Sequence, residues 1–370
     1  MALDAGARDK IGKDRDRMKK SLSIVATSRN DDHGGNLLHR MQLFVSGLLS
    51  QCERHDLNAE LILVEWNPPP DRPRLAEALS WPARPGPCCV RIIEVPPELH
   101  QRFKHADNLP LFQMIAKNAG IRRAQGRFVL ATNIDILFSD ELVRFWVSGR
   151  LEPGRLYRIN RHDVTGNIPQ DTPLEEQLDF CRRKTFRVCL RDGTLNLKTG
   201  EFHRIYDKLS FVRGRLYHLV AYLLPPRLKN LPLINNRFKL CRDTVRLHTN
   251  ASGDFTMMAK EDWSRLRGYP ELEMFSFHLD SLLCYMAHHA GIREAVLRYP
   301  VFHIDHSAGW TPEVERDQSL NKRLSDAQIP RITNEQLDDW AVQMRREKKP
   351  IIFNDVTWGM AEENLPETIP

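Results

Sequence analysis

The feature of this chain that most restricts its fold is a regular alternation of strand-like and helix-like segments over residues 21–132. Four short apolar runs have the length and composition of buried strands, and two segments between them repeat apolar side chains at helical spacing. The runs are residues 21–26, 60–66, 90–95 and 127–132, and the helical segments are residues 36–56 and 109–125. Such alternation predicts an α/β fold with a mostly parallel, Rossmann-like central sheet flanked by helices, which binds ligands at the carboxyl ends of its strands.

From about residue 165 the alternation stops, and the composition becomes basic, aromatic and proline-bearing. Residues 208–242 hold eight Lys or Arg and no Asp or Glu, whereas the net charge of the whole chain is +6. We interpret residues 165–250 as a basic helical insertion in the core domain. Its local charge favours docking to an anionic membrane surface or a negatively charged acceptor over general binding of nucleic acid. An ordinary helical subdomain with a solvated basic face is the alternative.

Hydropathy and cysteine content indicate the compartment. The longest apolar stretch, residues 219–224, is far shorter than the roughly 20 residues that a membrane-spanning helix needs. The first twenty residues are charged and contain no apolar run. The seven cysteines include no C-x-x-C pair, which argues against a zinc ribbon and against a disulfide framework. We therefore expect a cytoplasmic protein without a secretory signal, with peripheral contact at the inner face of the membrane as an option.

One acidic residue stands where an α/β sheet binds its ligands. Asn133-Ile134-Asp135 follows directly after the apolar run 127–132. A carboxylate at such a strand end can hold Mg²⁺ or Mn²⁺, hard cations that take one or two carboxylates together with substrate phosphates. An Asn-x-Asp triplet also forms Asx turns and helix caps, so the triplet alone is consistent with a structural role as well as with a metal site.

The residues around this triplet resemble a segment of the family 2 glycosyltransferases of the GT-A type. In that family a Lys/Arg-Asn-x-Gly-Ile helix and an Ala-x-Gly turn precede the strand that bears a metal-binding Asp-x-Asp. The matching positions here are Lys117, Asn118, Gly120, Ile121, Ala124, Gly126 and the triplet 133–135. The resemblance implies a GT-A fold, a nucleoside-diphosphate sugar as donor, and Mn²⁺ or Mg²⁺ as cofactor. Asn133 replaces the first acidic residue, which leaves Asp135 as the metal ligand and weakens the case for an obligatory metal.

Other residues follow the chain order of the same family. The first strand runs into residues 27–31, where the family contacts the nucleoside, and the second ends near Glu65, where the family has an Asp that faces the base or ribose. The resemblance therefore implies a set of residues that bind the nucleotide sugar. The set is Thr27, Arg29, Asp31, Glu65, Asn118, Arg122 and Asn133.

Residues 253–283 are similar to the acceptor side of the family. They contain an aromatic-bearing helix, a Gly-Tyr-Pro-Glu turn and an acidic residue that opens a helix. In inverting members that acidic residue is the general base, which takes the proton from the acceptor hydroxyl. Its position corresponds to Asp280, with Asp254 and Glu271 as alternatives. A charge that stabilises a helix N-terminus is the competing interpretation of Asp280.

A second metal ligand is expected in the sequence FHIDH at residues 302–306. GT-A enzymes often complete their metal site with a histidine from this region, and His303, Asp305 and His306 are the candidates. Period-2 alternation places residues 303 and 305 on one face of a strand and residue 306 off it, so the three cannot converge simply. We choose His306, which is closest to the following loop, and a structural histidine is the alternative.

These patterns divide the chain into five regions and favour one activity. The regions are a charged leader (1–20), a nucleotide-sugar-binding half (21–164), the basic insertion (165–250), an acceptor and catalytic half (251–310) and a C-terminal extension (311–370) with one helix near 335–347. The expected activity is inverting transfer of a hexose-like sugar to a glycan or lipid-linked acceptor, as in polysaccharide biosynthesis, with no nucleic-acid partner. One alternative is a nucleotidyltransferase. Enzymes of that class have a Gly-rich, Lys-bearing loop after the first strand, and residues 27–35 match such a loop poorly. The other alternative is a catalytically silent scaffold that binds a glycan or a membrane surface.

Overall fold

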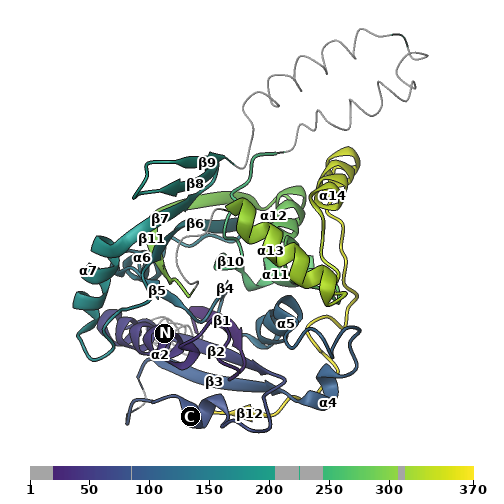
Figure 1. Ribbon diagram of the computed structural model, residues 1–370. Coiled ribbons are helices and arrows are strands. Elements are labelled where there is room, and N and C mark those ends of the chain that lie inside the picture. The colour runs from purple at the N-terminus through teal and green to yellow at the C-terminus, as the bar shows by residue number, and fades with distance from the viewer. Residues whose placement is uncertain (1–19, 85, 205–224, 226–244, 307–312) are drawn as a thin grey trace, which may run out of the picture.

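The computed structural model describes residues 20–84, 86–204, 225, 245–306 and 313–370. The predicted leader, apart from Lys20, and the basic stretch 208–242, apart from Pro225, lie outside the described residues. The described chain is an α/β fold in which one large sheet is flanked by helices (Figure 1). Within these ranges no helix is both long enough and apolar enough to cross a membrane.

The described strands form a single sheet of twelve strands, in the order β12-β3-β2-β1-β4-β10-β6-β7-β8-β9, with β11 beside β6 and β5 beside β11. The bounds are β1 Leu22–Ser28, β2 Ala59–Trp66, β3 Cys88–Val95, β4 Phe128–Thr132, β5 Ile136–Phe138, β6 Arg155–Val164, β7 Thr185–Leu190, β8 Gly193–Asn196, β9 Phe202–Arg204, β10 Phe255–Ala259, β11 Arg293–Ile304 and β12 Glu367–Thr368. The neighbours β3, β2, β1 and β4 are parallel, as is the pair of β11 and β6. The remaining neighbours are antiparallel, so the prediction of a mostly parallel sheet is wrong and the sheet is mixed.

The antiparallel pairing of β7, β8 and β9 follows from their connections. A parallel pair needs a crossover of about a dozen residues or more, whereas strands joined by short turns run antiparallel. β7, β8 and β9 are joined by short turns and follow α7 (Leu174–Lys184). These elements are the described beginning of the predicted insertion. They extend the central sheet, so this part of the insertion is not the helical subdomain that we expected.

Helices lie on both faces of the sheet (Figure 1). The remaining helices are α2 Leu37–His55, α3 Leu75–Ala78, α4 Pro97–His100, α5 Gln113–Arg123, α6 Asp140–Val147, α11 Lys260–Leu266, α12 Leu279–His289, α13 Glu313–Asp326 and α14 Asn334–Glu347. α2 and α6 pack on one face, and α5, α11, α12 and α14 pack on the other. α2 and α5 confirm the helices that the apolar spacing predicts, and α11, α12 and α14 confirm the helices expected in residues 253–283 and near 335–347, whereas α13 in the C-terminal extension is not predicted.

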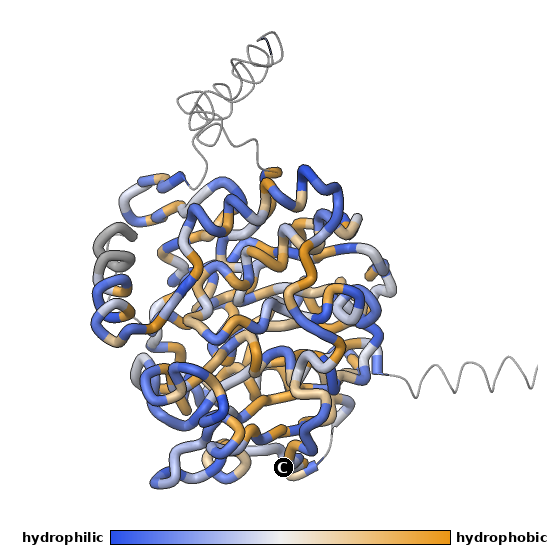
Figure 2. The backbone as a smooth tube through the Cα atoms, turned by 90° about the vertical axis from the view of Figure 1, so that its right-hand side faces the viewer, coloured by the Kyte–Doolittle hydropathy of each residue, from blue (hydrophilic) through white to orange (hydrophobic). Residues whose placement is uncertain are grey.

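Most of the described core lies in two apolar layers, one on each face of the sheet, and a smaller third cluster lies between α2, α7 and the ends of β6 and β11. Neighbouring residues of a strand point to opposite faces, so Ile24 of β1 packs in the layer of α2 and Val25 packs in the layer of α5. Hydrophobic residues follow the interior strands, and hydrophilic residues follow the outer loops (Figure 2). A β-carbon on Gly120 would lie 2.6 Å from Cγ1 of Val25, and one on Gly126 would lie 2.5 Å from the backbone nitrogen of Ser23. These two glycines of the family-like motif therefore allow α5 and the turn after it to approach β1 closely.

The C-terminal residues close one edge of the sheet. β12 pairs with β3, and Arg91 donates from Nε to Oε1 of Glu367 at 2.6 Å. Arg123 donates to the backbone carbonyls of Gly359, Met360 and Glu363. Pairing with β12 therefore covers the part of the β3 edge around Ile92 and Ile93.

Candidate functional site

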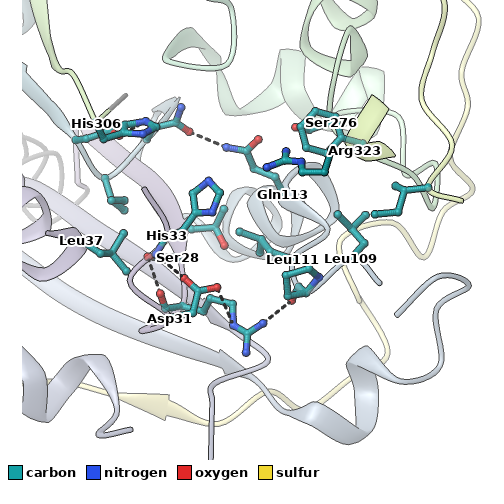
Figure 3. A pocket seen from close by; sticks show the side chains of 18 of the residues that line it. Ser28, Asp31, His33, Leu37, Leu109, Leu111, Gln113, Ser276, His306 and Arg323 are labelled. Atoms are coloured by element: carbon teal, nitrogen blue, oxygen red, sulfur yellow. Dashed lines mark hydrogen bonds and ion pairs between the residues drawn. The ribbon is translucent and has the colours of Figure 1, made fainter. Parts of the chain in front are cut away.

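A cavity of about 440 Å³ lies at the carboxyl ends of β1 and β4, within the size range of small-molecule sites (Figure 3). The β1–α2 loop, the start of α2 and the turn after β4 contribute most of its polar lining. Apolar side chains line it where the segment before α5 and the residues at the end of α13 contribute. The polar lining includes Arg29, Asp31, Arg40 and Asp135, and the apolar lining includes Leu109, Leu111, Leu324 and Ile329.

Pairing of β5 with β11 brings one carboxylate and two histidines together at the cavity. His303 pairs with Ile136, and the backbone nitrogen of Ile304 donates to the carbonyl oxygen of Asp135 at 2.9 Å. The Nε2 atoms of His303 and His306 lie 3.7 and 3.6 Å from Oδ2 of Asp135. One ligand atom from each of the three residues lies within 4.8 Å of the others. The cluster is thus formed by a contact between segments that are far apart in the sequence.

Asp163 at the end of β6 orients the ring of His303. Its Oδ1 lies 2.9 Å from Nδ1 of His303, and it also pairs with Arg161 and Arg187. Burial raises the pKa of Asp163, but Arg161, His303 and Arg187 together lower it more, so the group remains a carboxylate. An ionised acceptor at Nδ1 holds a proton on that nitrogen and leaves Nε2 facing Asp135.

The cluster fits a divalent cation. Oδ1 of Asp135 is buried and has no hydrogen-bond partner among the described residues. A carboxylate oxygen with two imidazole nitrogens suits Mn²⁺ better than Mg²⁺, which prefers oxygen ligands. Burial and Arg161 lower the pKa of His303, yet Asp135 and Asp163 raise it more, so the site favours positive charge. Arg40 already contacts Asp135, with Nη1 at 3.0 Å from Oδ2.

The side chain of Asn133 is committed to neighbouring protein groups. Its Oδ1 accepts hydrogen bonds from Nζ of Lys117 at 2.8 Å and from Nε2 of Gln113 at 3.0 Å. Its Nδ2 donates to Oδ1 of Asp254 at 2.5 Å. Lys117 is fully buried, and burial lowers its pKa to about 8 although Asp254 opposes the shift. The amide of Asn133 therefore joins α5 to the segment before β10 through Lys117, Gln113 and Asp254.

The structure gathers most of the loop residues that the sequence analysis selects. Thr27, Arg29, Asp31 and Asn133 line the cavity together with the two expected metal ligands, Asp135 and His306. They come from the β1–α2 connection, the turn after β4 and the end of β11, which meet at one edge of the sheet. These four residues of the predicted set therefore line one cavity with Asp135 and His306.

Three other selected residues lie outside the residues that line the cavity. Glu65 is buried, and its carboxylate oxygens accept a hydrogen bond from the backbone nitrogen of Leu75 at 3.0 and 3.2 Å, at the start of α3. Asn118 bonds both the backbone nitrogen and the carbonyl oxygen of Tyr269. The guanidinium of Arg122 lies over the ring of Trp358, 5.1 Å from its centroid. Each of these contacts joins parts of the fold.

The three acidic candidates for a general base also lie outside that lining, and they differ in their partners. Asp254 is buried and ion-paired with Arg161 at 2.5 Å. Glu271 accepts hydrogen bonds from the side chain of Asn118 and from the backbone nitrogen of Gly359. Asp280 is half-buried and accepts hydrogen bonds from the hydroxyl of Ser252 at 2.7 Å and from the backbone nitrogen of Ser281 at 2.9 Å.

Two residues near Asp135, Arg40 and His303, are not among the ligands that the sequence analysis chooses. Arg40 is an ordinary polar position of a helical segment, and no local signal marks it as the partner of Asp135. The sequence offers His303 as a candidate beside His306, and period-2 alternation keeps the two apart for as long as the strand continues. The strand ends at Ile304, however, so His306 lies beyond the alternation and turns back towards Asp135. Knowledge that β11 ends at Ile304 would have been enough to predict that His303 and His306 can converge.

Comparisons with known proteins add no family to this description. A scan against protein-family models and a search of curated proteins both find no match to the chain. The function therefore has to be inferred from the residues and geometry of the site.

Proposed function

We propose that this protein is a GT-A type glycosyltransferase that moves a sugar from a nucleoside diphosphate to a glycan or lipid-linked acceptor, with assistance from a divalent cation. The observation that carries the proposal is the carboxylate of buried Asp135, at a cavity lined in part by the loop after β1. Its Oδ2 lies near two histidines, and its Oδ1 has no hydrogen-bond partner among the described residues. The family resemblance of residues 117–135 supports the same activity.

The lining of the cavity suits a ligand with an anionic part and an apolar part. Arg29 and Arg323 offer guanidinium groups, which bind phosphate oxygens in a bidentate manner. Leu109, Leu111 and Ile329 offer an apolar wall, against which the face of a nucleobase can pack. A nucleoside diphosphate combines both kinds of group, so it fits this lining better than an inorganic anion or a purely apolar ligand does.

In the proposed reaction the residues of the chain bind and orient the donor, and one of them removes a proton from the acceptor. Asp135, His303 and His306 would hold the cation, which stabilises the negative charge that develops on the departing diphosphate. Arg29 and Arg323 bind the diphosphate oxygens and fix the direction in which the leaving group departs. Asp163 keeps Nε2 of His303 available as a ligand by holding the proton on Nδ1.

Asp280 is our choice for the general base of this reaction. Asp254 is neutralised by Arg161 in a buried ion pair, and Glu271 is engaged by two donors that join parts of the fold. Asp280 is more exposed than Asp254 and faces no cation at ion-pair distance among the described residues. A base on the side of the anomeric carbon opposite the leaving group would invert the configuration of the transferred sugar.

A catalytically silent scaffold is the second candidate, and one contact favours it. Arg40 occupies Oδ2 of Asp135, the oxygen nearest to both histidines, and so supplies a positive charge without any metal. In a silent scaffold the same cavity would bind its ligand without turnover. The two candidates differ in whether Mn²⁺ binds and whether a donor is consumed.

A thermal-shift screen tests the proposal. The purified chain is heated with UDP, GDP, dTDP, CDP or CMP, with and without Mn²⁺, together with Asp135→Asn and, as a matched control, Asp71→Asn at an exposed loop position. A ligand at about 100 times its dissociation constant adds roughly 2.7 kcal/mol to the stability of the folded state. We expect one nucleoside diphosphate to stabilise the wild type in a manner that Mn²⁺ enhances, and Asp135→Asn alone to lose the enhancement. Stabilisation that Mn²⁺ does not change would favour the silent scaffold.

A further inference from the structure

The guanidinium of Arg40 joins two parts of the site. Arg40 lies in the first turn of α2 and is 3% exposed. Its Nη1 donates to Oδ2 of Asp135 at 3.0 Å, its Nη2 donates to the carbonyl oxygens of His33 and Gly35 at 2.5 and 3.2 Å, and its Nε donates to the carbonyl of Gly35 at 3.3 Å. One side chain thus ties the carboxylate of the candidate metal site to the β1–α2 loop.

The loop that Arg40 holds, residues 32–36, has a strained backbone. Asp32 and Asn36 have φ values of 57° and 50°, in the left-handed region, which Asp and Asn adopt more readily than other residues with a β-carbon but which remains less favourable than the right-handed region. Gly34 is also left-handed and lies so close to His306 that a β-carbon on it would be 2.6 Å from Nδ1. Strain of this kind persists only while surrounding contacts hold it. Loss of the contacts of Arg40 would therefore allow the loop to relax.

A divalent cation and the guanidinium of Arg40 compete for the same place. Oδ2 of Asp135 is the atom that Arg40 contacts, and it is also the carboxylate oxygen that lies 3.7 and 3.6 Å from the two imidazole nitrogens. The side chains of Arg40 and Asp135 are 4% and 8% exposed, so water screens the repulsion between two neighbouring cations only weakly.

We propose that Arg40 is an internal counter-cation, which holds Asp135 and the loop 32–36 together until a divalent cation bound by Asp135, His303 and His306 displaces it and releases the loop. Asp31 and His33 of the β1–α2 connection line the cavity, so release of the loop reshapes the wall against which the nucleotide binds. This inference rests on the cation site of the proposed function and adds to it a link between cation binding and the nucleotide pocket.

The first test measures the affinity for Mn²⁺ from the loss of the electron paramagnetic resonance signal of free Mn²⁺. Arg40→Met removes the charge and keeps most of the stem, and Arg54→Met on the same helix is the control. We expect Arg40→Met to bind Mn²⁺ on the order of tenfold more tightly than the wild type, because the competing charge is gone. Arg40→Lys keeps the charge and should stay close to the wild type. A residue with only a structural role would weaken Mn²⁺ binding when it is replaced.

The outcomes separate this inference from the proposed function. Equal affinities of the wild type and Arg40→Met, with binding lost in Asp135→Asn, would overturn the role of Arg40 and leave the cation site standing. Absence of Mn²⁺ binding from both folded proteins would overturn the cation site as well. Tighter binding by Arg40→Met, together with unchanged Arg54→Met, would support the competition.

The second test uses the wild-type protein, so it stands even if Arg40→Met does not fold. Hydrogen exchange of the peptide that covers residues 32–40 is followed as Mn²⁺ is added. We expect exchange in this peptide to become faster, while a peptide from the buried strand β2 keeps its rate. Slower or unchanged exchange in residues 32–40 at saturating Mn²⁺ would contradict release of the loop.

Discussion

Nδ1 of His303 lies 2.9 Å from Oδ1 of Asp163, and this contact determines which ring nitrogen faces Asp135. Asp163 is itself held by Arg161 and Arg187, so the orientation of the histidine depends on a buried group of charges at the ends of β6 and β7. A carboxylate that accepts from the far nitrogen of a histidine is a common support of metal ligands. The contact links the fold of the sheet to the proposed chemistry.

Replacement of Asp163 by Asn should weaken the cation site without touching its ligands. We expect the affinity for Mn²⁺ to fall by about 10- to 100-fold. The loss of a buried partner of two arginines should also lower the free energy of unfolding by about 3 kcal/mol. Mn²⁺ titration and urea unfolding measure the two effects separately. Wild-type affinity in a variant with the expected loss of stability would show that Asp163 supports the fold alone.

Asp254 and Asp280 should respond differently to the same change. Asp254→Asn leaves Arg161 without its closest carboxylate and should reduce the free energy of unfolding by about 3 kcal/mol. Asp280→Asn weakens a hydrogen bond from Ser252 and should reduce it by only about 1 kcal/mol, yet it should reduce sugar transfer at least 100-fold, in the range of a lost general base. Denaturation and turnover are measured on both variants. An active Asp280→Asn would exclude it as the base.

Much of the central sheet was predictable from the sequence, because the residues that make a segment a buried strand lie within the segment itself. The apolar runs that became β1, β2, β3 and β4 are buried on both faces, and such runs are recognisable without knowledge of their neighbours. The proposed ligand Asp135 follows directly from the end of one such run. The family resemblance also located Thr27, Arg29 and Asp31, which do line the cavity.

The rest of the site depends on contacts between distant segments, which local patterns do not contain. The pairing of β11 with β5 determines that His303 and His306 both approach Asp135. Arg40 meets Asp135 across 95 residues of sequence. Glu65 lies near the end of β2, as predicted, but its side chain bonds to the start of α3 instead of lining the cavity. The direction of a side chain at a strand end is set by tertiary packing, which periodicity does not report.

The buried carboxyl group of Glu65 should make stability depend on pH. Burial raises its pKa from the ordinary 4.5 to about 7, although the hydrogen bond from Leu75 opposes the shift. The folded state therefore binds this proton more tightly than the unfolded state, so the stabilisation is fully present below pH 4.5 and is lost as the pH rises through 7.

Glu65→Gln tests this dependence because glutamine does not titrate and can still accept from the backbone. We expect the stability of the variant relative to the wild type to increase by up to about 3 kcal/mol between pH 4.5 and pH 8. Urea unfolding at several pH values measures the difference. A constant difference over this range would mean that Glu65 keeps an ordinary pKa in the folded protein.

Arg323 near the end of α13 should contribute to nucleotide binding. Its side chain lines the cavity, and a charge-assisted bond to a phosphate oxygen strengthens binding. Arg323→Ala should raise the dissociation constant of the nucleoside diphosphate by on the order of tenfold, because the group is partly open to solvent. Lys322→Ala, at an exposed neighbouring position of the same helix, is the control. Equal losses in both variants would indicate a general effect of charge.

The most direct test of donor cleavage is the hydrolysis of a nucleotide sugar whose base was selected by thermal shift, in which water takes the place of the acceptor and receives the sugar while the nucleoside diphosphate is released. Release is followed in the presence of Mn²⁺ for the wild type, Asp135→Asn and the control Asp71→Asn. We predict that the wild type and the control release the diphosphate and that Asp135→Asn slows release at least about 100-fold, in line with the loss of charge stabilisation at the leaving group. Release at the wild-type rate by Asp135→Asn, or no release from any donor that binds, would contradict the proposed glycosyltransferase.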